Sequence, residues 1–409
     1  MSQAKTPTSV KEIVSEKNLM VEMSVLTATL VPGKLGISSK KLTKKQSVIN
    51  KALLVAAEGG KSVNLTAALQ DGADPAVCDS AGVTALMHAA GSGSLSCVKK
   101  LLATASVGLD LIDRSGRNAW FHALENGKPE TMEEIGRVLE ERDKKKKTKD
   151  VKKWNCVGGK YAKVYNAIHL AVKSGSMRCV ELAIKAGVKM DVLAGPISRS
   201  ALMMAAREGD VEMVALLAQA GDAKLVSPHG ETALGLAVSG SKHEVVELLA
   251  PKSGRDICDK ALLFAAESYG TKMVELLIPW SSRDIRNNEG ATPSMLAAQH
   301  TNPDAFKKLL PMPDPWARDK FGRSVLLYAV RSMSLDMVGT VLDEISRTNP
   351  SNLVMCVELA KALGAAVEQH GAINPLLNFL TTRLEVHIQA EEIDGVAVIK
   401  NGTRKLPRL

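Results

Sequence analysis

The sequence contains few aromatic residues. Four Trp, four Tyr and five Phe make up 3% of the 409 residues, whereas 45% of the chain is hydrophobic. A core of this composition consists mainly of Ala, Leu, Val and Met. Because the strands of β-sandwiches and barrels favour aromatic and β-branched residues, the composition argues against those folds. It favours closely packed helices instead.

Long hydrophobic runs and paired cysteine motifs are also absent. The longest apolar stretch, residues 21–31, contains Ser24, Thr27 and Thr29 and is shorter than the roughly 18 residues that span a bilayer. The six cysteines include no C-x-x-C pair, and their spacing fits neither a zinc site nor a disulfide framework. The first residues have no apolar core beside a basic leader, so we expect no secretory signal. We therefore expect an intracellular, cytoplasmic protein without membrane insertion, with a nuclear location as the alternative.

The positive charge of the chain is confined to two segments. The formal net charge is +9. Residues 1–50 carry eight Lys and three Glu, and residues 142–153 carry eight basic and two acidic groups. The rest of the chain is slightly acidic. A broad basic face for nucleic acid is therefore not supported by the charge distribution.

One short phrase recurs along the chain and divides it into units. Examples are TALMHAA at residues 84–90, SALMMAA at 200–206 and KALLFAA at 260–266. The first alanine of the closing pair serves as an anchor for each copy, and the nine anchors are Ala56, Ala89, Ala123, Ala171, Ala205, Ala237, Ala265, Ala297 and Ala329. Most anchors are 32 to 34 residues apart, with one long spacing of 48 and one short spacing of 28. A constant period of this size indicates an array of small supersecondary units.

Each unit contains the pattern of two short helices and a polar link. The recurring phrase places Ala and Leu on a narrow apolar stripe, which predicts a first helix. In six copies a glycine follows within a few residues and can end that helix in a tight turn, namely Gly59, Gly93, Gly127, Gly175, Gly209 and Gly240. A second apolar run, such as MVELLI at residues 273–278, predicts an antiparallel second helix. The last two copies lack the turn glycine and are expected to be less regular.

The unit resembles the ankyrin repeat, whose pattern runs D-x-x-G-x-T-P-L-H-x-A-A-x-x-G. The best matches are Asp79, Gly82, Thr84, Leu86, Ala89, Ala90 and Gly93 in one copy, and Gly230, Thr232, Leu234 and Ala237 in another. The Thr-Pro pair occurs only at Thr292-Pro293, and the histidine only at His169. The resemblance implies an all-α ankyrin-repeat solenoid of about nine helix-turn-helix units with a helical carboxy-terminal cap.

The domain organisation follows from the extent of the repeats. Residues 1–47 are predicted to be a basic, partly disordered lead-in, and residues 48–348 the repeat array. The long spacing places a lysine-rich loop insertion at residues 142–160. Residues 349–409 are predicted to be a helical cap and tail, since a solenoid end needs a polar-faced cap.

No constellation of residues suggests catalysis. His88, His122 and His169 lie in three first helices, but equivalent residues of successive units are about 10 Å apart, too far for one metal ion. Cys97 and Cys179 occupy the same second-helix position and are expected to pack as small hydrophobic residues. The Gly-Gly-Lys at residues 158–160 lacks the rest of a phosphate-binding loop. We therefore predict no enzyme activity, no metal, no cofactor and no small-molecule substrate.

The resemblance implies a protein-interaction scaffold or adaptor that binds other proteins through the concave face of the array. Carried onto matching positions, the residues predicted to contact a partner are Arg114, Arg117, His229, Glu231, Asn288, Glu289, Lys320, Phe321, Arg323 and Arg331. The best candidate for an anchor is Phe321, a large apolar residue at the predicted tip of a link. The alternative is that Phe321 folds back onto the next unit.

The lysine-rich insertion supports a second hypothesis. It contains Lys144, Lys145, Lys146, Lys147, Lys149, Lys152 and Lys153. Such a segment is either a solvated loop or a site for nuclear import or acidic partners. The alternative function is therefore a nuclear or nucleic-acid-associated regulatory factor.

Overall fold

The computed structural model describes residues 44–104, 107–146, 166–268 and 270–347, together with residues 357–359, 361, 362, 364, 375 and 378–385 of the tail. It confirms the predicted all-α repeat fold. The described residues form nine pairs of short helices. The described residues include an isolated antiparallel bridge between Cys78 and Thr84 and no extended strand. The chain divides into two compact units, Met1–Ser198 and Arg199–Leu409, which are described separately below.

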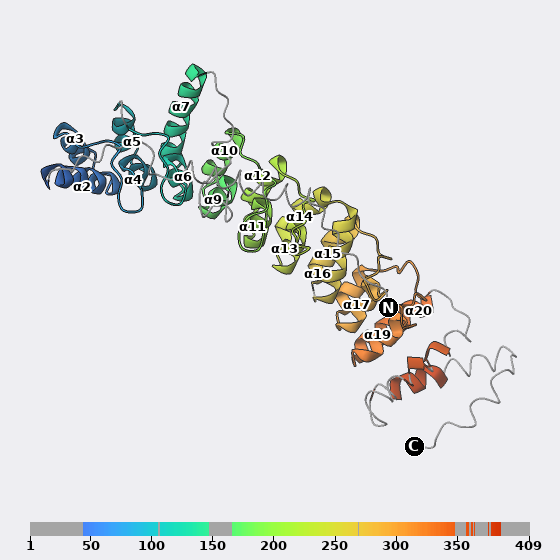
Figure 1. Cartoon of the computed structure of the whole chain (residues 1–409). Helices are drawn as coiled ribbons and strands as arrows, with labels where there is room; N and C mark the ends of the chain where they lie inside the picture. Colours follow the sequence, from blue (N-terminus) through green and yellow to red (C-terminus); the bar gives the residue numbers. More distant parts are fainter. Residues whose placement is uncertain are drawn as a thin grey trace, which may run out of the picture. The chain divides into compact units, whose positions relative to one another are not determined.

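The first unit contains four helix pairs, which follow one another in a row in Figure 1. They are α2 (Lys44–Glu58) with α3 (Ser62–Gln70), α4 (Ala85–Ser92) with α5 (Leu95–Leu102), α6 (Ala119–Glu125) with α7 (Pro129–Lys146), and α9 (Ala167–Lys173) with α10 (Met177–Lys185). Each first helix packs against the first helix of the next pair, and each second helix against the next second helix. α2 begins inside the segment that was predicted as a lead-in.

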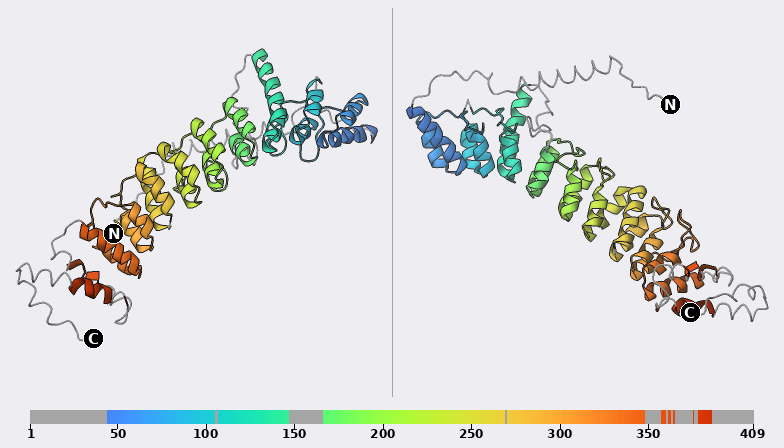
Figure 2. Two further views of the ribbon diagram at one scale, coloured as in Figure 1. Left: turned by 180° about the vertical axis from the view of Figure 1, so that it is seen from behind. Right: turned by 60° about the horizontal axis from the view of Figure 1, so that its bottom comes forward.

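The second unit contains five pairs stacked in the same way, as Figure 2 also shows. They are α11 (Ala201–Glu208) with α12 (Val211–Ala220), α13 (Ala233–Ser239) with α14 (His243–Ser253), α15 (Arg255–Glu267) with α16 (Thr271–Leu277), α17 (Pro293–Gln299) with α18 (Pro303–Lys308), and α19 (Val325–Arg331) with α20 (Leu335–Arg347). A short 3-10 helix, η1 (Ile278–Trp280), follows α16. Unlike the other first helices of this unit, α15 has 13 residues.

The anchor alanines explain why the helices approach closely. All nine are at most 3% exposed, so small side chains lie wherever neighbouring first helices meet, and close packing follows. Cys97 and Cys179 are fully buried in second helices, which confirms that they pack as small hydrophobic residues. Burial raises the pKa of the Cys179 thiol, which favours the neutral form.

Polar side chains define where most first helices begin. The residue before the helix accepts a hydrogen bond from the backbone N–H three positions on in six pairs, through Thr84, Asn118, Asn166, Ser200, Thr232 and Thr292. This contact satisfies an amide that would otherwise lack a partner at the helix start. Ser324, which precedes α19, makes no such bond.

The turn between the two helices of a pair contains one left-handed residue at a fixed distance from the anchor. Four residues after the anchor, φ is positive in every pair whose turn is described; the residues are Gly60, Gly93, Gly127, Gly175, Gly209, Ser241, Thr301 and Met333. In two pairs the left-handed residue therefore directly follows the predicted glycine, Gly59 or Gly240. The last two pairs keep this geometry without glycine.

Thr301→Gly is expected to raise the melting temperature. A left-handed backbone strains a β-branched residue but not glycine, so the gain should be up to about 1 kcal/mol. The matched reverse change is Gly175→Ala, where φ is +69° and an added Cβ meets no atom within 4 Å. It should lower stability by a similar amount. Thermal unfolding of both variants measures this, and a destabilised Thr301→Gly would contradict it.

The lysine-rich segment departs from the prediction at its start. α7 continues to Lys146 and is visibly longer than neighbouring helices in Figure 1. Lys144, Lys145 and Lys146 therefore lie in a helix and not in a loop. Helix-favouring residues and an ion pair of 2.6 Å from Arg137 to Glu141 support the extension. Lys147, Lys149, Lys152 and Lys153 lie outside the described residues.

Candidate functional site

Four links that lead into first helices are each closed by one side-chain oxygen. In the last link, Asp319 Oδ1 accepts the backbone N–H groups of Phe321 and Arg323 at 2.9 and 2.8 Å. Asp79, Asp113 and Asn287 accept equivalent pairs of amides in their own links. A left-handed glycine completes the tip of the turn, at Gly322 in the last link. These bonds fix the backbone of the tips.

The second oxygen of the link carboxylate contacts the first helix. His88 Nε2 lies 3.2 Å from Asp79 Oδ2, and His122 Nε2 lies 3.0 Å from Asp113 Oδ2. In the last helix pair, Tyr328 takes the place of this histidine, and its hydroxyl donates a hydrogen bond to Asp319 at 2.8 Å. Two of the three predicted structural histidines therefore hold a link against its helix.

The third histidine is buried in α9. His169 is fully buried, and its Nδ1 contacts Asn166 Oδ1. All three histidines thus have structural contacts, as predicted. Within the described ranges, no group of His, Cys, Asp and Glu side chains is arranged to hold a metal ion.

The carboxylates that close the links are held in their charged form. Burial alone would raise the pKa of Asp113, but hydrogen bonds from His122 and Arg117 lower it to about 2. The pKa of Asp319 is also lowered, because the bonds from Arg323 and Tyr328 outweigh burial. Burial and the contact with Asp319 raise the pKa of Tyr328 to about 12. The charge of each carboxylate thus stabilises its link.

The last two links of the second unit are joined to one another. Lys320 N donates to Glu289 O at 2.9 Å, and Arg286 Nη1 donates to Arg318 O at 2.7 Å. Arg323 reaches across to Glu289 at 3.0 Å. These two hydrogen bonds and the ion pair connect the two tips into one continuous surface.

Phe321 lies exposed at the end of this surface. Its side chain is 68% exposed, so it does not fold back onto the neighbouring repeat. The Arg323 guanidinium lies 4.6 Å from the centre of its ring, a distance at which a cation attracts an aromatic face. Because Arg323 is itself held by Asp319 and Glu289, the ring is presented from a rigid support.

Four of the predicted contact residues, Arg117, Glu231, Glu289 and Arg323, have structural partners. Arg117 pairs with Asp113 at 2.9 Å and with Glu125 at 2.5 Å. Arg323 pairs as described above, and Glu231 is bound by Arg199 through two hydrogen bonds of 2.6 and 2.8 Å. These side chains and Glu289, the partner of Arg323, stabilise the links, which the sequence pattern did not indicate.

The remaining predicted contact residues have exposed side chains. Arg114 lies on a link of the first unit, and its backbone N–H donates to Ala81 O at 3.0 Å. In the second unit these residues are His229, Asn288, Lys320 and Arg331, together with Phe321 described above. Lys320 and Arg331 make no ion pair with the described part of the chain. Their charges are available to a ligand.

Phe264, on the first helix α15, is a second exposed aromatic residue of this unit. The sequence pattern did not indicate it. Phe264 precedes the anchor of α15, at the position that Tyr328 occupies in α19. It is 43% exposed, whereas Leu236, Leu296 and Tyr328 at this position are at most 8% exposed. Only Gly254 separates α14 from α15, so no link covers the helix here. The short spacing of 28 residues was the available signal.

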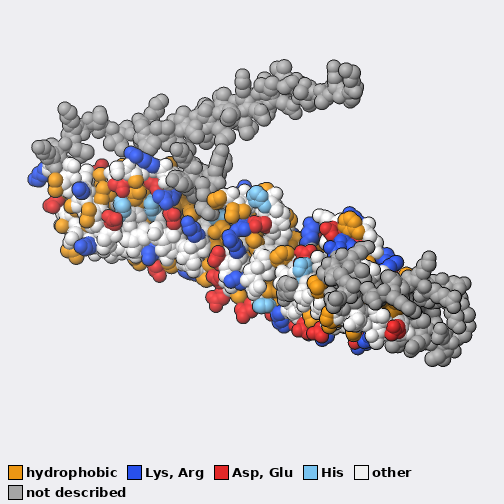
Figure 3. Space-filling view, turned by 90° about the horizontal axis from the view of Figure 1, so that it is seen from below, with side chains coloured by type: hydrophobic (Ala, Val, Ile, Leu, Met, Phe, Trp, Pro, Cys, Tyr) orange, Lys and Arg blue, Asp and Glu red, His pale blue; other side chains and the backbone are white. Residues whose placement is uncertain are grey.

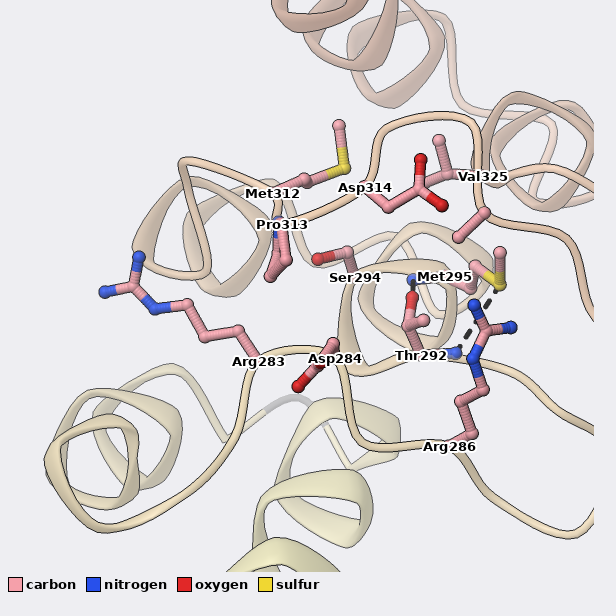
Figure 4. Close-up of a pocket in the computed structure, with 11 residues that line it drawn as sticks. Arg283, Asp284, Arg286, Thr292, Ser294, Met295, Met312, Pro313, Asp314 and Val325 are labelled. Carbon is pink, nitrogen blue, oxygen red and sulfur yellow. Dashed lines mark hydrogen bonds between the residues drawn. The ribbon is translucent and has the colours of Figure 1, made fainter.

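A small pocket is lined by residues of the links that lead into α17 and α19 (Figure 4). Its enclosed space is about 20 Å³, which has room for roughly one water molecule. Thr292 and Met295, in the lining, are joined by the capping bonds of α17 in Figure 4. The space is too small for an organic cofactor.

The described surface carries both charge signs. On the face drawn in Figure 3, Lys and Arg side chains are interspersed with Asp and Glu. The described side chains on this face form no basic stripe of the kind that tracks a nucleic-acid backbone. None of the helices in the described residues combines the length and hydrophobicity needed to cross a membrane.

Comparison with known proteins supports the repeat assignment. No curated protein matches the chain. Among solved structures, a chain from the complex of the Bd0816 predatory endopeptidase of Bdellovibrio bacteriovorus with the immunity protein Bd3460 is 27% identical, with a TM-score of 0.40. The alignment covers 49% of the present chain and 98% of that chain. The family model for ankyrin repeats, in three copies, matches residues 53–150, 165–261 and 262–352. The chain therefore belongs to the ankyrin-repeat family.

Proposed function

We propose that this protein is a non-enzymatic scaffold or adaptor that binds partner proteins through the link tips and first helices of its second unit. Ankyrin repeats are in general protein-interaction modules. The observation that carries the proposal is Phe321, which is 68% exposed on a tip fixed by hydrogen bonds. An exposed aromatic residue on a rigid support loses little conformational entropy on binding, so it suits a binding anchor.

The surroundings of Phe321 support the same proposal. Lys320 and Arg331 add charges without ion-pair partners among the described residues, and Phe264 adds apolar area on a first helix of the same unit. Aromatic side chains and arginine are enriched where proteins bind one another, which favours Phe321, Phe264 and Arg331 over Lys320. Arg323 and Glu231, which are engaged in ion pairs, are assigned to the support and not to the contact.

Phe321→Ala is expected to reduce partner capture about tenfold or more, the effect of losing one interface anchor. Phe264→Ala should cause a smaller loss. The measurement is quantitative mass spectrometry of proteins retained from native lysate by the full chain. Because Phe321 is mostly exposed, its removal should leave the melting temperature unchanged.

The matched control is Trp280→Ala. Trp280 is an aromatic residue of the same unit and is 45% exposed, but it ends η1, directly after a second helix, and is part of neither a link tip nor a first helix. The Trp280→Ala variant should retain every partner that the unsubstituted chain retains. Equal retention by the Phe321 and Trp280 variants would contradict the proposed binding face.

A further inference from the structure

Glu358, in the tail that follows the last repeat, is a buried carboxylate with contacts to the last link. Its side chain is 3% exposed. It forms an ion pair with Arg318, accepts the Ser324 hydroxyl at 2.8 Å, and lies 3.4 Å from Lys361 Nζ. Leu359 and Ala362, beside it in the tail, are fully buried. This part of the tail is therefore packed against the last unit.

Ser324 shows that the contact replaces a feature of the other units. The six capping residues named above use their side chain to accept an amide of the following helix, but Ser324 makes no such bond. Its hydroxyl donates to Glu358 instead. The start of α19 is thus held by the tail and not by its own cap.

Arg318 carries the contact to the tip of the link. Its Nη2 pairs with Glu358, and its Nη1 donates to Gly322 O at 2.9 Å. Gly322 directly follows Phe321. Arg286 makes the equivalent bond in the preceding link, to Gly290 O at 3.1 Å, but no carboxylate among the described tail residues pairs with it. Within the described part of the tail, the Glu358 contact therefore supports the tip that presents the exposed aromatic ring.

We propose that Glu358 is a positioning residue: it holds the tip of residues 319–323 through Arg318 and Ser324, so that docking of the tail sets the orientation of Phe321. This inference rests on the proposed function, because it concerns the same binding surface. Without the Glu358 carboxylate, Arg318 loses its charged partner and Ser324 its acceptor. The tip then opens more often, while the stacked helices stay folded.

Hydrogen exchange of the full chain tests this inference without any partner. In Glu358→Gln, amides of residues 319–323 should exchange about tenfold faster, the factor expected for loss of one charged hydrogen bond. Arg318→Gln should have a similar effect, and the double variant should add little, since both changes break one contact. Amides of the link at residues 227–231 should be unchanged in all three.

The matched control is Glu344→Gln, which removes another buried carboxylate of the last unit. Glu344 is 8% exposed and pairs with Arg347 on α20, away from the tip. Unchanged exchange at residues 319–323 in Glu358→Gln would overturn the inference. So would faster exchange spread equally over α19 and α20, or an equal effect of Glu344→Gln. These outcomes are independent of Phe321→Ala capture, which tests the proposed function alone.

Discussion

Asp319→Ala should lower the free energy of unfolding of the last repeats by about 3–5 kcal/mol, the usual cost of removing one partner of a buried charged network. The Asp319 side chain is fully buried. It accepts bonds from the Phe321 and Arg323 amides, the Arg323 guanidinium and the Tyr328 hydroxyl. Its loss leaves these donors without their acceptor and removes the support of the tip.

Urea unfolding followed by circular dichroism measures this effect. The matched control is Asp304→Ala, because Asp304 is 76% exposed and its contact with Lys307 spans 4.0 Å. An exposed pair at this distance contributes at most a few tenths of a kcal/mol, about 0.5 or less. If both variants unfold at the same urea concentration, Asp319 does not hold the link together.

Acid should weaken the first unit through Asp113. The pKa of this carboxyl is lowered from its ordinary value of 3.8 to about 2. As pH falls, the carboxyl is therefore protonated at a lower pH in the folded state than in the unfolded state. The stabilisation is therefore complete only above about pH 5 and is lost as pH falls through 4 towards 2. It amounts to about 2 kcal/mol, since one pKa unit corresponds to about 1.4 kcal/mol.

Asp113→Asn isolates this contribution. An amide oxygen can still accept the link amides, as Asn287 does in its own link, but it carries no charge for Arg117 and His122. The variant should be about 2 kcal/mol less stable at pH 6, with the difference shrinking towards pH 2. Urea unfolding measured at several pH values checks this, and a difference that stays constant from pH 6 to 2 would contradict the assignment.

Local pattern was enough to predict the repeating unit. The anchor alanines predicted where first helices meet, because only small side chains allow that approach, and all of them are buried. The link position given by the resemblance predicted Phe321 at an exposed tip, with folding back onto the next repeat as the alternative, and the ring is 68% exposed. These features depend on residues close to one another in the sequence.

Contacts between distant residues could not be predicted in this way. Arg323 and Glu231 resembled free contact residues in the sequence, but their charges are paired with Glu289 and Arg199. The lysine-rich segment resembled a loop from end to end, but α7 extends into it. Whether a charged side chain faces a partner or solvent depends on which links lie beside it.

The sequence by itself determined the period, the helix pairs and the tips, because each unit repeats the same short-range pattern of small residues, caps and turns. Tertiary structure alone decided which side chains remain accessible. Phe264 is exposed because its unit lacks a covering link, and Glu358 supports the last tip from 40 residues beyond Arg318. Burial and pairing depend on what stacking brings together, and a single unit does not specify its neighbours.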